Sequence, residues 1–297
     1  MTVTLRSARG RTCGRRSPAP PVAVLLALAL IAALTLPAAS QAPRPYRILV
    51  TNDDGVRAPG LAALADALAA IGEVTIIGPL ENHSGTGHAI TLSDPIYADE
   101  VPLAGGRSAV GLSATPASCV RLALARLLPE PPDLVVSGVN RGSNFGLNAY
   151  ISGTVAAARE AAMHGIPAIA ASLDIAGHPD YGPAAAAAAE VAGGVKRDGL
   201  PPGVFLNVNV PAGPAGALKG LKLVRQSRRG GSERFDERRT PWGRRYFWSM
   251  FQQPTAAESD SDVQAALDGY VAVTPLVASE FDDRVFDGLK GRLRWSR

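Results

Sequence analysis

The sequence predicts an α/β fold in which helices cover both faces of a mostly parallel sheet. From Arg47 to about Val210, short aliphatic segments alternate with longer amphipathic or alanine-rich segments. The first kind is typical of buried strands, and the second of helices that pack on a sheet. Strands and helices that alternate in this way form parallel sheets, because each helix returns the chain to the same end of the sheet. We therefore expect a Rossmann-like core.

The first strand and the first helix have the clearest patterns. Arg47–Thr51 is apolar and β-rich, which indicates a buried strand. A helix is predicted from Pro59 to about Leu68, because proline favours the first helical turn and Leu61, Leu64 and Leu68 share one face. The remaining core predictions are strands at 74–77, 134–137, 168–171 and 204–208, and helices at about 116–128, 154–164 and 183–195.

After about Val210 the pattern becomes β-rich. Segments 221–224, 244–248 and 270–273 have strand character, and no helix is predicted between them. The run 225–245 is rich in Arg, Gly and Ser, and we interpret it as an exposed hairpin or loop with solvated charges. Binding of phosphate or a partner by its arginines is the alternative. The expected organisation is an α/β core over about 47–210 and a C-terminal extension over about 211–297.

The first forty residues have the organisation of a secretory signal. An apolar run, Val22–Leu36, is followed by Ala38 and Ser40, which suit cleavage before Gln41. The run is shorter than the ~20 residues of a helix that crosses a bilayer. We expect a cleaved signal over residues 1–40 and export to the periplasm, whereas a misassigned start near Arg47 would leave the protein cytoplasmic. The basic residues before the run are Arg6, Arg9, Arg11, Arg15 and Arg16.

Cleavage of this signal changes the charge of the chain. The chain has 30 Lys and Arg, of which five lie in the leader, so 25 remain against 26 Asp and Glu. The basic character of the whole chain is therefore no evidence for binding to a nucleic acid polymer. Cys119 is the one cysteine beyond the leader, which excludes an internal disulfide in the processed protein.

Polar residues gather where the predicted strands end. Asn52, Asp53 and Asp54 follow the first strand, the loop 81–88 follows the second, and the loop 138–144 follows the strand at 134–137. Ligands of parallel sheets bind beyond the carboxyl ends of the strands. Carboxylate, hydroxyl and amide oxygens suit a hard cation such as Mg²⁺, Mn²⁺ or Ca²⁺. These three strand ends therefore form a candidate cation site.

The pair Asp53-Asp54 allows two interpretations. With Gly55 it can form a turn in which the carboxylates cap backbone amides and no metal binds. At a strand end, however, the backbone turns, and two adjacent carboxylates can converge on one ion. The tripeptide alone favours the turn, whereas the strand before it and the helix after it favour a site.

A second candidate segment, Tyr150–Val155, precedes the alanine-rich helix at 154–164. Ser152 or Thr154 can cap that helix, and the free amides of its first turn favour an anion such as phosphate. His88 follows Gly87 in the loop 81–88 and is a candidate for contact with the substrate, whereas His164 is interpreted as a helix cap. The chain has no HExxH spacing and no Gly-x-Ser-x-Gly elbow, which disfavours zinc peptidases and serine hydrolases.

Several blocks in this order resemble the SurE survival-protein family of metal-dependent 5′/3′-nucleotidases. Two features depart from the family's pattern. Ser118 occupies a position that is usually Asp, which puts local contacts at the start of that helix in doubt, and the export signal is unusual in a mostly cytoplasmic family. The blocks that carry the resemblance are Arg47–Val56, Ala58–Gly60, the residues Pro79, Asn82, Ser84-Gly85 and Thr91-Leu92, and then Ser137–Gly142, Asn144-x-Gly146, Tyr150–Glu160, Asn207–Pro211 and Asp268–Leu276.

The resemblance implies one divalent cation, Mg²⁺ or Mn²⁺, and a phosphoric monoester hydrolase that acts on nucleoside monophosphates and also on short polyphosphate. It implies a protruding hairpin and a homodimer or homotetramer. The implied metal ligands are Asp53, Asp54, the Ser84 hydroxyl and the Asn140 side chain. The phosphate contacts expected beside them are Asn144, Ser152, Gly153 and Thr154, with His88 as a further candidate.

Three interpretations of the function remain open from the sequence. The first is in-line attack by a metal-activated water without a phospho-enzyme, with Asp53 or Asp54 orienting or deprotonating the water. The second is an exported nucleotide- or sugar-binding protein that has the same fold and no turnover. The third is an aspartyl-phosphate phosphatase with Asp53 as nucleophile. The complete ligand set favours the first.

Overall fold

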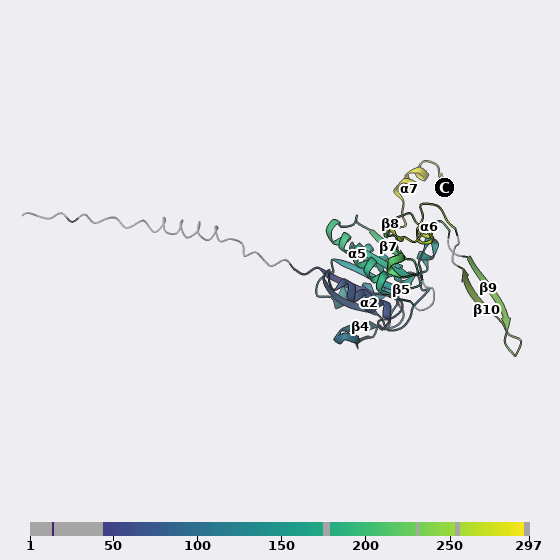
Figure 1. Cartoon of the computed structure of the whole chain (residues 1–297), viewed down its shortest axis with the longest axis horizontal. Helices are drawn as coiled ribbons and strands as arrows, with labels where there is room; N and C mark the ends of the chain where they lie inside the picture. The colour runs from purple at the N-terminus through teal and green to yellow at the C-terminus, as the bar shows by residue number, and fades with distance from the viewer. Residues whose placement is uncertain (1–13, 15–43, 175–178, 230–231, 253–255, 294–297) are drawn as a thin grey trace, which may run out of the picture. The chain divides into compact units, whose positions relative to one another are not determined.

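The computed structural model describes residues 14, 44–174, 179–229, 232–252 and 256–293 (Figure 1). The predicted signal at 1–40 lies, except for Gly14, outside the described residues. Residues 45–297 form a unit of their own. Among the described residues, no helix has both the length and the apolar character needed to cross a membrane.

A sheet of nine strands organises this unit, in the order β3-β4-β2-β1-β5-β6-β7-β11-β8. The five neighbouring strands β2, β1, β5, β6 and β7 are all parallel, with β1 between β2 and β5. The prediction of a mostly parallel sheet is confirmed. The strands are β1 (Arg47–Thr51), β2 (Glu73–Pro79), β3 (Ala98–Pro102), β4 (Ser108–Leu112), β5 (Leu134–Arg141), β6 (Ala168–Leu173), β7 (Val204–Val210), β8 (Leu221–Leu223) and β11 (Val271–Val277).

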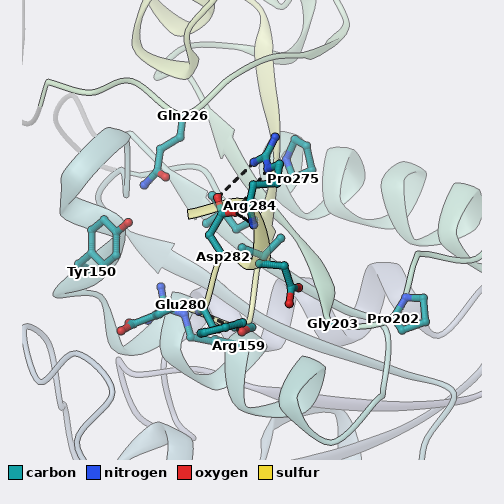
Figure 2. A pocket seen from close by; sticks show the side chains of 14 residues that line it. Tyr150, Arg159, Pro202, Gly203, Gln226, Pro275, Glu280, Asp282 and Arg284 are labelled. Carbon is teal, nitrogen blue, oxygen red and sulfur yellow. Dashed lines mark hydrogen bonds and ion pairs between the residues drawn. The ribbon is translucent and has the colours of Figure 1, made fainter. Parts of the chain in front are cut away.

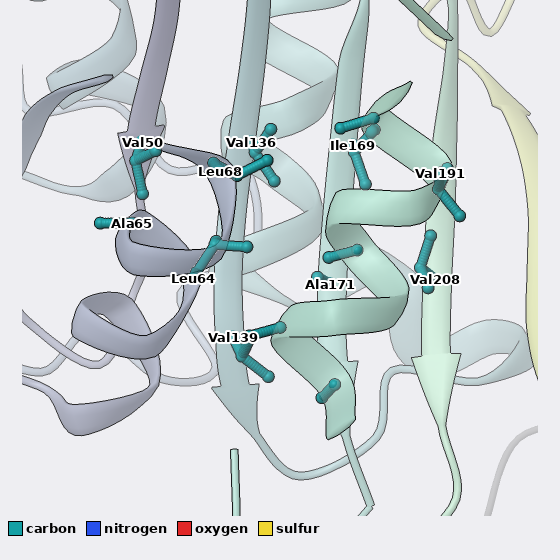
Figure 3. Packing of buried hydrophobic residues seen from close by; sticks show 14 of the residues in the cluster. Val50, Leu64, Ala65, Leu68, Val136, Val139, Ile169, Ala171, Val191 and Val208 are labelled. Carbon is teal, nitrogen blue, oxygen red and sulfur yellow. The ribbon is translucent and has the colours of Figure 1, made fainter. Parts of the chain in front are cut away.

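Helices cover both faces of the sheet because the strands are apolar on both faces. Ile48 and Val50 of β1 join the hydrophobic cluster under α2 (Pro59–Leu68) and α5 (Gly182–Asp198), part of which is shown in Figure 3. Leu49 points the other way and joins the cluster under α3 (Pro116–Leu122) and α4 (Gly153–Met163). Side chains that alternate between two cores explain why the strands read as continuous apolar runs.

The C-terminal extension contributes to the main sheet, which therefore continues beyond Val210. β8 pairs parallel with β11, and β11 pairs antiparallel with β7. The expectation of strands without intervening helices was wrong, since α6 (Asp262–Leu267) precedes β11 and a further helix, α7 (Asp283–Lys290), follows it. Ser261 caps α6 by accepting from the Gln264 N–H. A helix of six residues is too short to give a readable helical period.

The basic run forms a separate two-stranded antiparallel hairpin, β9 (Ser232–Arg239) and β10 (Arg245–Gln252). Some of its charges are paired across or along the strands rather than only solvated. Arg245 Nε lies 2.6 Å from Glu237 Oε1, and Arg238 Nη2 lies 2.8 Å from Asp236 Oδ2. Trp242 at the turn is 89% exposed. The hairpin predicted from the sequence is confirmed.

Candidate functional site

A pocket of about 260 Å³ opens where β1 and β5 end. It is the place where three predicted loops meet, because parallel neighbouring strands end at the same edge of the sheet. Five of the candidate residues line the pocket: Asp53, Ser84, Asn140, Asn144 and Ser152. Among the other candidates, Asp54, Gly153 and Thr154 adjoin these residues in the chain without lining the pocket, and His88 lies against a different partner.

Asp53 is the most constrained of these residues, with 2% of its surface exposed. The Thr154 hydroxyl donates to Asp53 Oδ1 over 2.5 Å. Burial raises the pKa of the Asp53 carboxyl, while the Thr154 hydroxyl and backbone N–H groups of Thr154, Asp53 and Gly153 lower it. The first turn of α4 therefore rests directly on the carboxylate that the sequence places at the end of β1.

Gly153 is required by this close contact. A Cβ at position 153 would lie 2.8 Å from Asp53 Cβ and 3.0 Å from Asp53 Oδ2. We expect Gly153→Ala to displace Asp53 and to weaken Mn²⁺ binding by about tenfold or more, as changes beside metal ligands do. This effect is measured by titrating the apoprotein with Mn²⁺ and monitoring the electron paramagnetic resonance signal of the free ion.

Gly193→Ala is the matched control for that variant. Gly193 lies inside α5, and a Cβ added there would have open space around it to 4 Å, so alanine should fit and stabilise the helix by about 1 kcal/mol. Its Mn²⁺ affinity should equal that of the original protein. Unchanged affinity in Gly153→Ala would show that Asp53 does not need its present position.

Asp54 is less buried than Asp53 and is held by different groups. Its Oδ2 accepts from the Arg141 N–H over 3.0 Å, and its Oδ1 lies 3.4 Å from Asn82 Nδ2. Burial raises the pKa of Asp54 to about 6, the Arg141 N–H lowers it, and the negative charge of Asp53 raises it. The pKa values of both adjacent carboxyl groups are raised, and a bound cation would reduce the repulsion between their negative charges.

Asn140 and Asn144 line the pocket, and the amide nitrogen of each is hydrogen-bonded to a neighbouring group. Asn140 Nδ2 donates to the Gly142 carbonyl over 2.7 Å, and Asn144 Nδ2 donates to Ser172 Oγ over 2.8 Å. Because each amide nitrogen is engaged, the Oδ1 atom of each remains as the acceptor. Together with Asp53 and the exposed Ser84 hydroxyl, the donor set consists of oxygens and fits a hard divalent cation. No group of three or more His, Cys, Asp or Glu that could hold a metal occurs in the described part of the chain.

The start of α4 has both capping and anchoring roles. Ser152 Oγ accepts from the Val155 N–H over 3.1 Å. Of the two capping residues that the sequence allows, Ser152 and Thr154, it is therefore Ser152 that caps α4. Thr154 is fully buried, and its hydroxyl is engaged by Asp53. Since the N–H groups of Gly153 and Thr154 donate to Asp53 and that of Val155 donates to Ser152, what this turn offers an anion is chiefly the positive end of the helix dipole.

Glu160 is a residue of this region that was not predicted from the sequence. It lies on α4, is fully buried, and accepts from three side chains. His88 Nε2 lies 2.8 Å from its Oε2, while Arg121 Nε and His164 Nε2 lie 2.9 and 3.1 Å from its Oε1. His164 does occupy the C-cap position of α4, but its ring contacts this carboxylate. Likewise, His88 Nε2 is directed to Glu160 and not to the pocket.

The Glu160 cluster predicts acid-sensitive stability. Burial raises the pKa of Glu160, but hydrogen bonds from His88, Arg121 and His164 and the charge of Arg121 lower it to about 2, below the ordinary value of 4.5. A depressed pKa stabilises the fold above the unfolded value, and this contribution is lost as pH falls from 4.5 towards about 2. Urea unfolding at stepped pH should show a steeper loss for the original protein than for Glu160→Gln. Equal slopes would contradict the prediction.

Ser118 stands where the resemblance predicts an acidic residue, and its hydroxyl group makes two hydrogen bonds. Its Oγ accepts from the Thr91 N–H over 2.8 Å and from the Thr115 hydroxyl over 2.9 Å. These bonds connect the start of α3 to the loop that precedes β3. The departure at this position therefore leaves the local hydrogen bonds satisfied.

A larger cavity of about 960 Å³ lies elsewhere, among Tyr150, Arg159 and the residues around the start of α7 (Figure 2). Its charged lining has both signs, with Arg159 and Arg284 beside Glu280 and Asp282. None of the candidate ligand or phosphate residues lines it. The smaller pocket, where oxygen donors converge, is therefore the candidate site.

Known proteins are similar to this chain in both sequence and fold. The sequence profile described as "Survival protein SurE" matches residues 48–233. The chain belongs to the SurE family. A 5'-nucleotidase SurE of Syntrophotalea carbinolica is 45% identical over 257 residues, which is 84% of this chain and 97% of the relative. One from Geobacter sulfurreducens is 46% identical over 231 residues, 77% of this chain and 87% of the relative.

A solved SurE structure supports the same assignment. The crystal structure of the SurE protein from Aquifex aeolicus has a TM-score of 0.72 and 35% identity, and it covers 82% of this chain and 98% of that protein. The Rossmann-like fold predicted from the sequence is confirmed by this similarity. The matched profile region spans the strand ends that carry Asp53, Asp54, Ser84 and Asn140.

Proposed function

We propose that this SurE-family chain is a metal-dependent 5′/3′-nucleotidase that hydrolyses nucleoside monophosphates to a nucleoside and phosphate. The observation that carries the proposal is the pocket that Asp53, Ser84 and Asn140 line together. Relatives named 5'-nucleotidase SurE, at 40–46% identity over most of the chain, support the same activity. Short polyphosphate is a further proposed substrate.

Four residues would hold the cation: Asp53, Ser84 and Asn140, which line the pocket, and Asp54, which adjoins Asp53 in the chain. When bound, a Mg²⁺ or Mn²⁺ ion supplies Lewis acidity towards a phosphate oxygen and lowers the pKa of water. Asp53 suits a fixed ligand, because Thr154 and backbone N–H groups immobilise it. Asp54 is less buried and suits the orientation or deprotonation of the attacking water.

The phosphate group would lie against the start of α4. The Ser152 hydroxyl and the second amide hydrogen of Asn144 would donate to it, and the positive end of the helix dipole at Gly153 and Thr154 favours an anion there. Such preorganised groups stabilise the charge that gathers on the phosphate oxygens during in-line attack. His88 is assigned no contact with phosphate, since Glu160 holds its Nε2.

Phosphate release from a panel of nucleoside monophosphates tests this function. The purified protein should release phosphate with Mn²⁺ or Mg²⁺ and stop when EDTA removes the metal. A nucleotide- or sugar-binding protein would instead bind these ligands tightly without release. A trapped phospho-enzyme would support Asp53 as a nucleophile and contradict direct attack by water.

The proposal also includes the cellular localisation and the oligomeric state of the protein. The basic leader, the short apolar run and the small residues before Gln41 support an exported enzyme that scavenges nucleotides. N-terminal sequencing of the native protein tests cleavage, and sedimentation tests the proposed homodimer or homotetramer.

A further inference from the structure

The loop that carries Ser84 is fastened to the site on both sides of that residue. Before Ser84, the His83 N–H donates to the Asp53 carbonyl over 2.7 Å. After it, the Gly87 N–H donates to the Ile151 carbonyl over 3.0 Å, and His88 Nε2 lies 2.8 Å from Glu160 Oε2. Ser84 itself is exposed, so its position depends on these attachments.

The His88 contact attaches this loop, through a side chain, to the body of α4. Glu160 is fully buried and holds its carboxylate between α3 and α4 by its bonds to Arg121 and His164. A carboxylate with a pKa of about 2 only accepts, so His88 Nε2 carries the proton. The His88 side chain is 23% exposed, so this bond is largely shielded from water.

The same helix connects both parts of the site. Its first turn holds Asp53 through Thr154, and Glu160 two turns later holds the far end of the Ser84 loop through His88. The far end of the Ser84 loop and the Asp53 carboxylate are therefore both attached to α4, in addition to the direct bond from the His83 N–H to the Asp53 carbonyl. Ligands fixed in this way bind a metal more tightly than ligands on a free loop, since less conformational entropy is lost.

We infer that His88 is a positioning residue, which through Glu160 holds the Ser84 loop on α4 and so fixes Ser84 for the cation. The inference rests on the proposed function, because it assigns Ser84 as a metal ligand. It also explains why a histidine from this loop is directed away from the pocket. His88 contacts neither the phosphate nor the cation; it acts through the loop.

Direct Mn²⁺ binding to the apoprotein tests this role, with the free-ion electron paramagnetic resonance signal as readout. His88→Ala should weaken Mn²⁺ binding by about tenfold, the lower end of the effect of residues that orient metal ligands. At saturating Mn²⁺, kcat should return close to its original value, because no group that touches substrate is lost. His88→Gln, whose amide N–H can still donate to Glu160, should restore most of the affinity.

His164→Ala is the matched control. It removes another imidazole bond to the same carboxylate, 3.1 Å long, without touching the Ser84 loop. Its Mn²⁺ affinity should stay within about twofold of the original. Equal losses in His88→Ala and His164→Ala, or no loss in His88→Ala, would overturn the inference and make the cluster a purely structural one.

The proposed function and this inference fail in different ways. If the original protein bound no Mn²⁺, or if Asp53→Asn bound it equally well, the metal site itself would be wrong. If the original protein bound Mn²⁺ and lost it on Asp53→Asn but not on His88→Ala, only the role of His88 would be wrong. Circular dichroism melting of each variant confirms that a folded protein is compared.

Discussion

Asp53→Asn is expected to lower kcat/KM for nucleoside monophosphates by more than about a hundredfold. Residues that merely orient metal ligands cost roughly 10–100-fold when changed, and the loss of a charged ligand should exceed that range. Asparagine has nearly the same shape, and its Oδ1 can still accept from the Thr154 hydroxyl, although its Nδ2 cannot accept from the backbone N–H groups. Phosphate release at stepped Mn²⁺ concentrations measures the loss.

The stability of the same variant distinguishes a functional from a structural role. Asp53 is 2% exposed, and its hydrogen-bond donors are a hydroxyl and backbone N–H groups. An ionised carboxylate buried in this way costs stability until a cation is bound. Metal-free Asp53→Asn should therefore melt at the same temperature as the original protein or above it, and added Mn²⁺ should raise the melting temperature of the original protein only.

A surface aspartate provides the control for this change. Asp198→Asn makes the same chemical change in a side chain that is 65% exposed and paired with Arg197. It should leave both kcat/KM and the effect of Mn²⁺ on melting unchanged. If Asp53→Asn lost activity and also melted well below the original in the absence of metal, Asp53 would be a structural residue and the metal assignment would fail.

Local patterns predicted the central part of the fold well. The first helix has the predicted bounds, Pro59–Leu68, because proline sets its start and the leucine spacing shows its buried face. β3 was not predicted, since it has one buried residue, Val101, and so lacks an alternating pattern. The pairing of β11 with β7 depends on contacts between residues more than sixty positions apart, which no local window contains.

The candidate site was predictable where it depends on strand ends. Asp53, Ser84, Asn140 and Asn144 meet because parallel strands bring their carboxyl ends to one edge. Glu160 was not predicted as a site residue, because a single acidic residue in an alanine-rich helix does not show its partners, although it ends the block Tyr150–Glu160 that carries the family resemblance. Its partners Arg121 and His88 come from 39 and 72 residues away. Those distant partners also explain why the sequence could not show that His88 Nε2 lies against Glu160.

Asp262→Ala is expected to give the largest loss of stability, about 3 to 5 kcal/mol in the free energy of unfolding. Asp262 is fully buried at the start of α6, and it accepts from the N–H groups of Gly146 (2.8 Å), Ser227 (2.9 Å) and Val263 (2.9 Å). Burial raises the pKa of the Asp262 carboxyl while these N–H groups lower it, so desolvation offsets part of the bonds. Alanine, however, would leave three buried N–H groups without this acceptor, at a cost of about 1–3 kcal/mol each that adds incompletely. Urea unfolding measures the loss.

Asp262 matters for the site because Gly146 begins the short helix Gly146–Tyr150, which leads into the pocket residues Ile151 and Ser152. A released Gly146 should therefore raise KM for the nucleotide even below the melting temperature. Asp260→Ala is the control, since Asp260 is 63% exposed and its ion pair with Arg225 should contribute less than about 1 kcal/mol. If both variants lost the same small amount, the extension would be attached to the core by other contacts. A large loss of stability in Asp262→Ala alone, together with a raised KM, would mean that this buried carboxylate of the C-terminal extension positions the segment Gly146–Ser152 at a pocket formed by the α/β core.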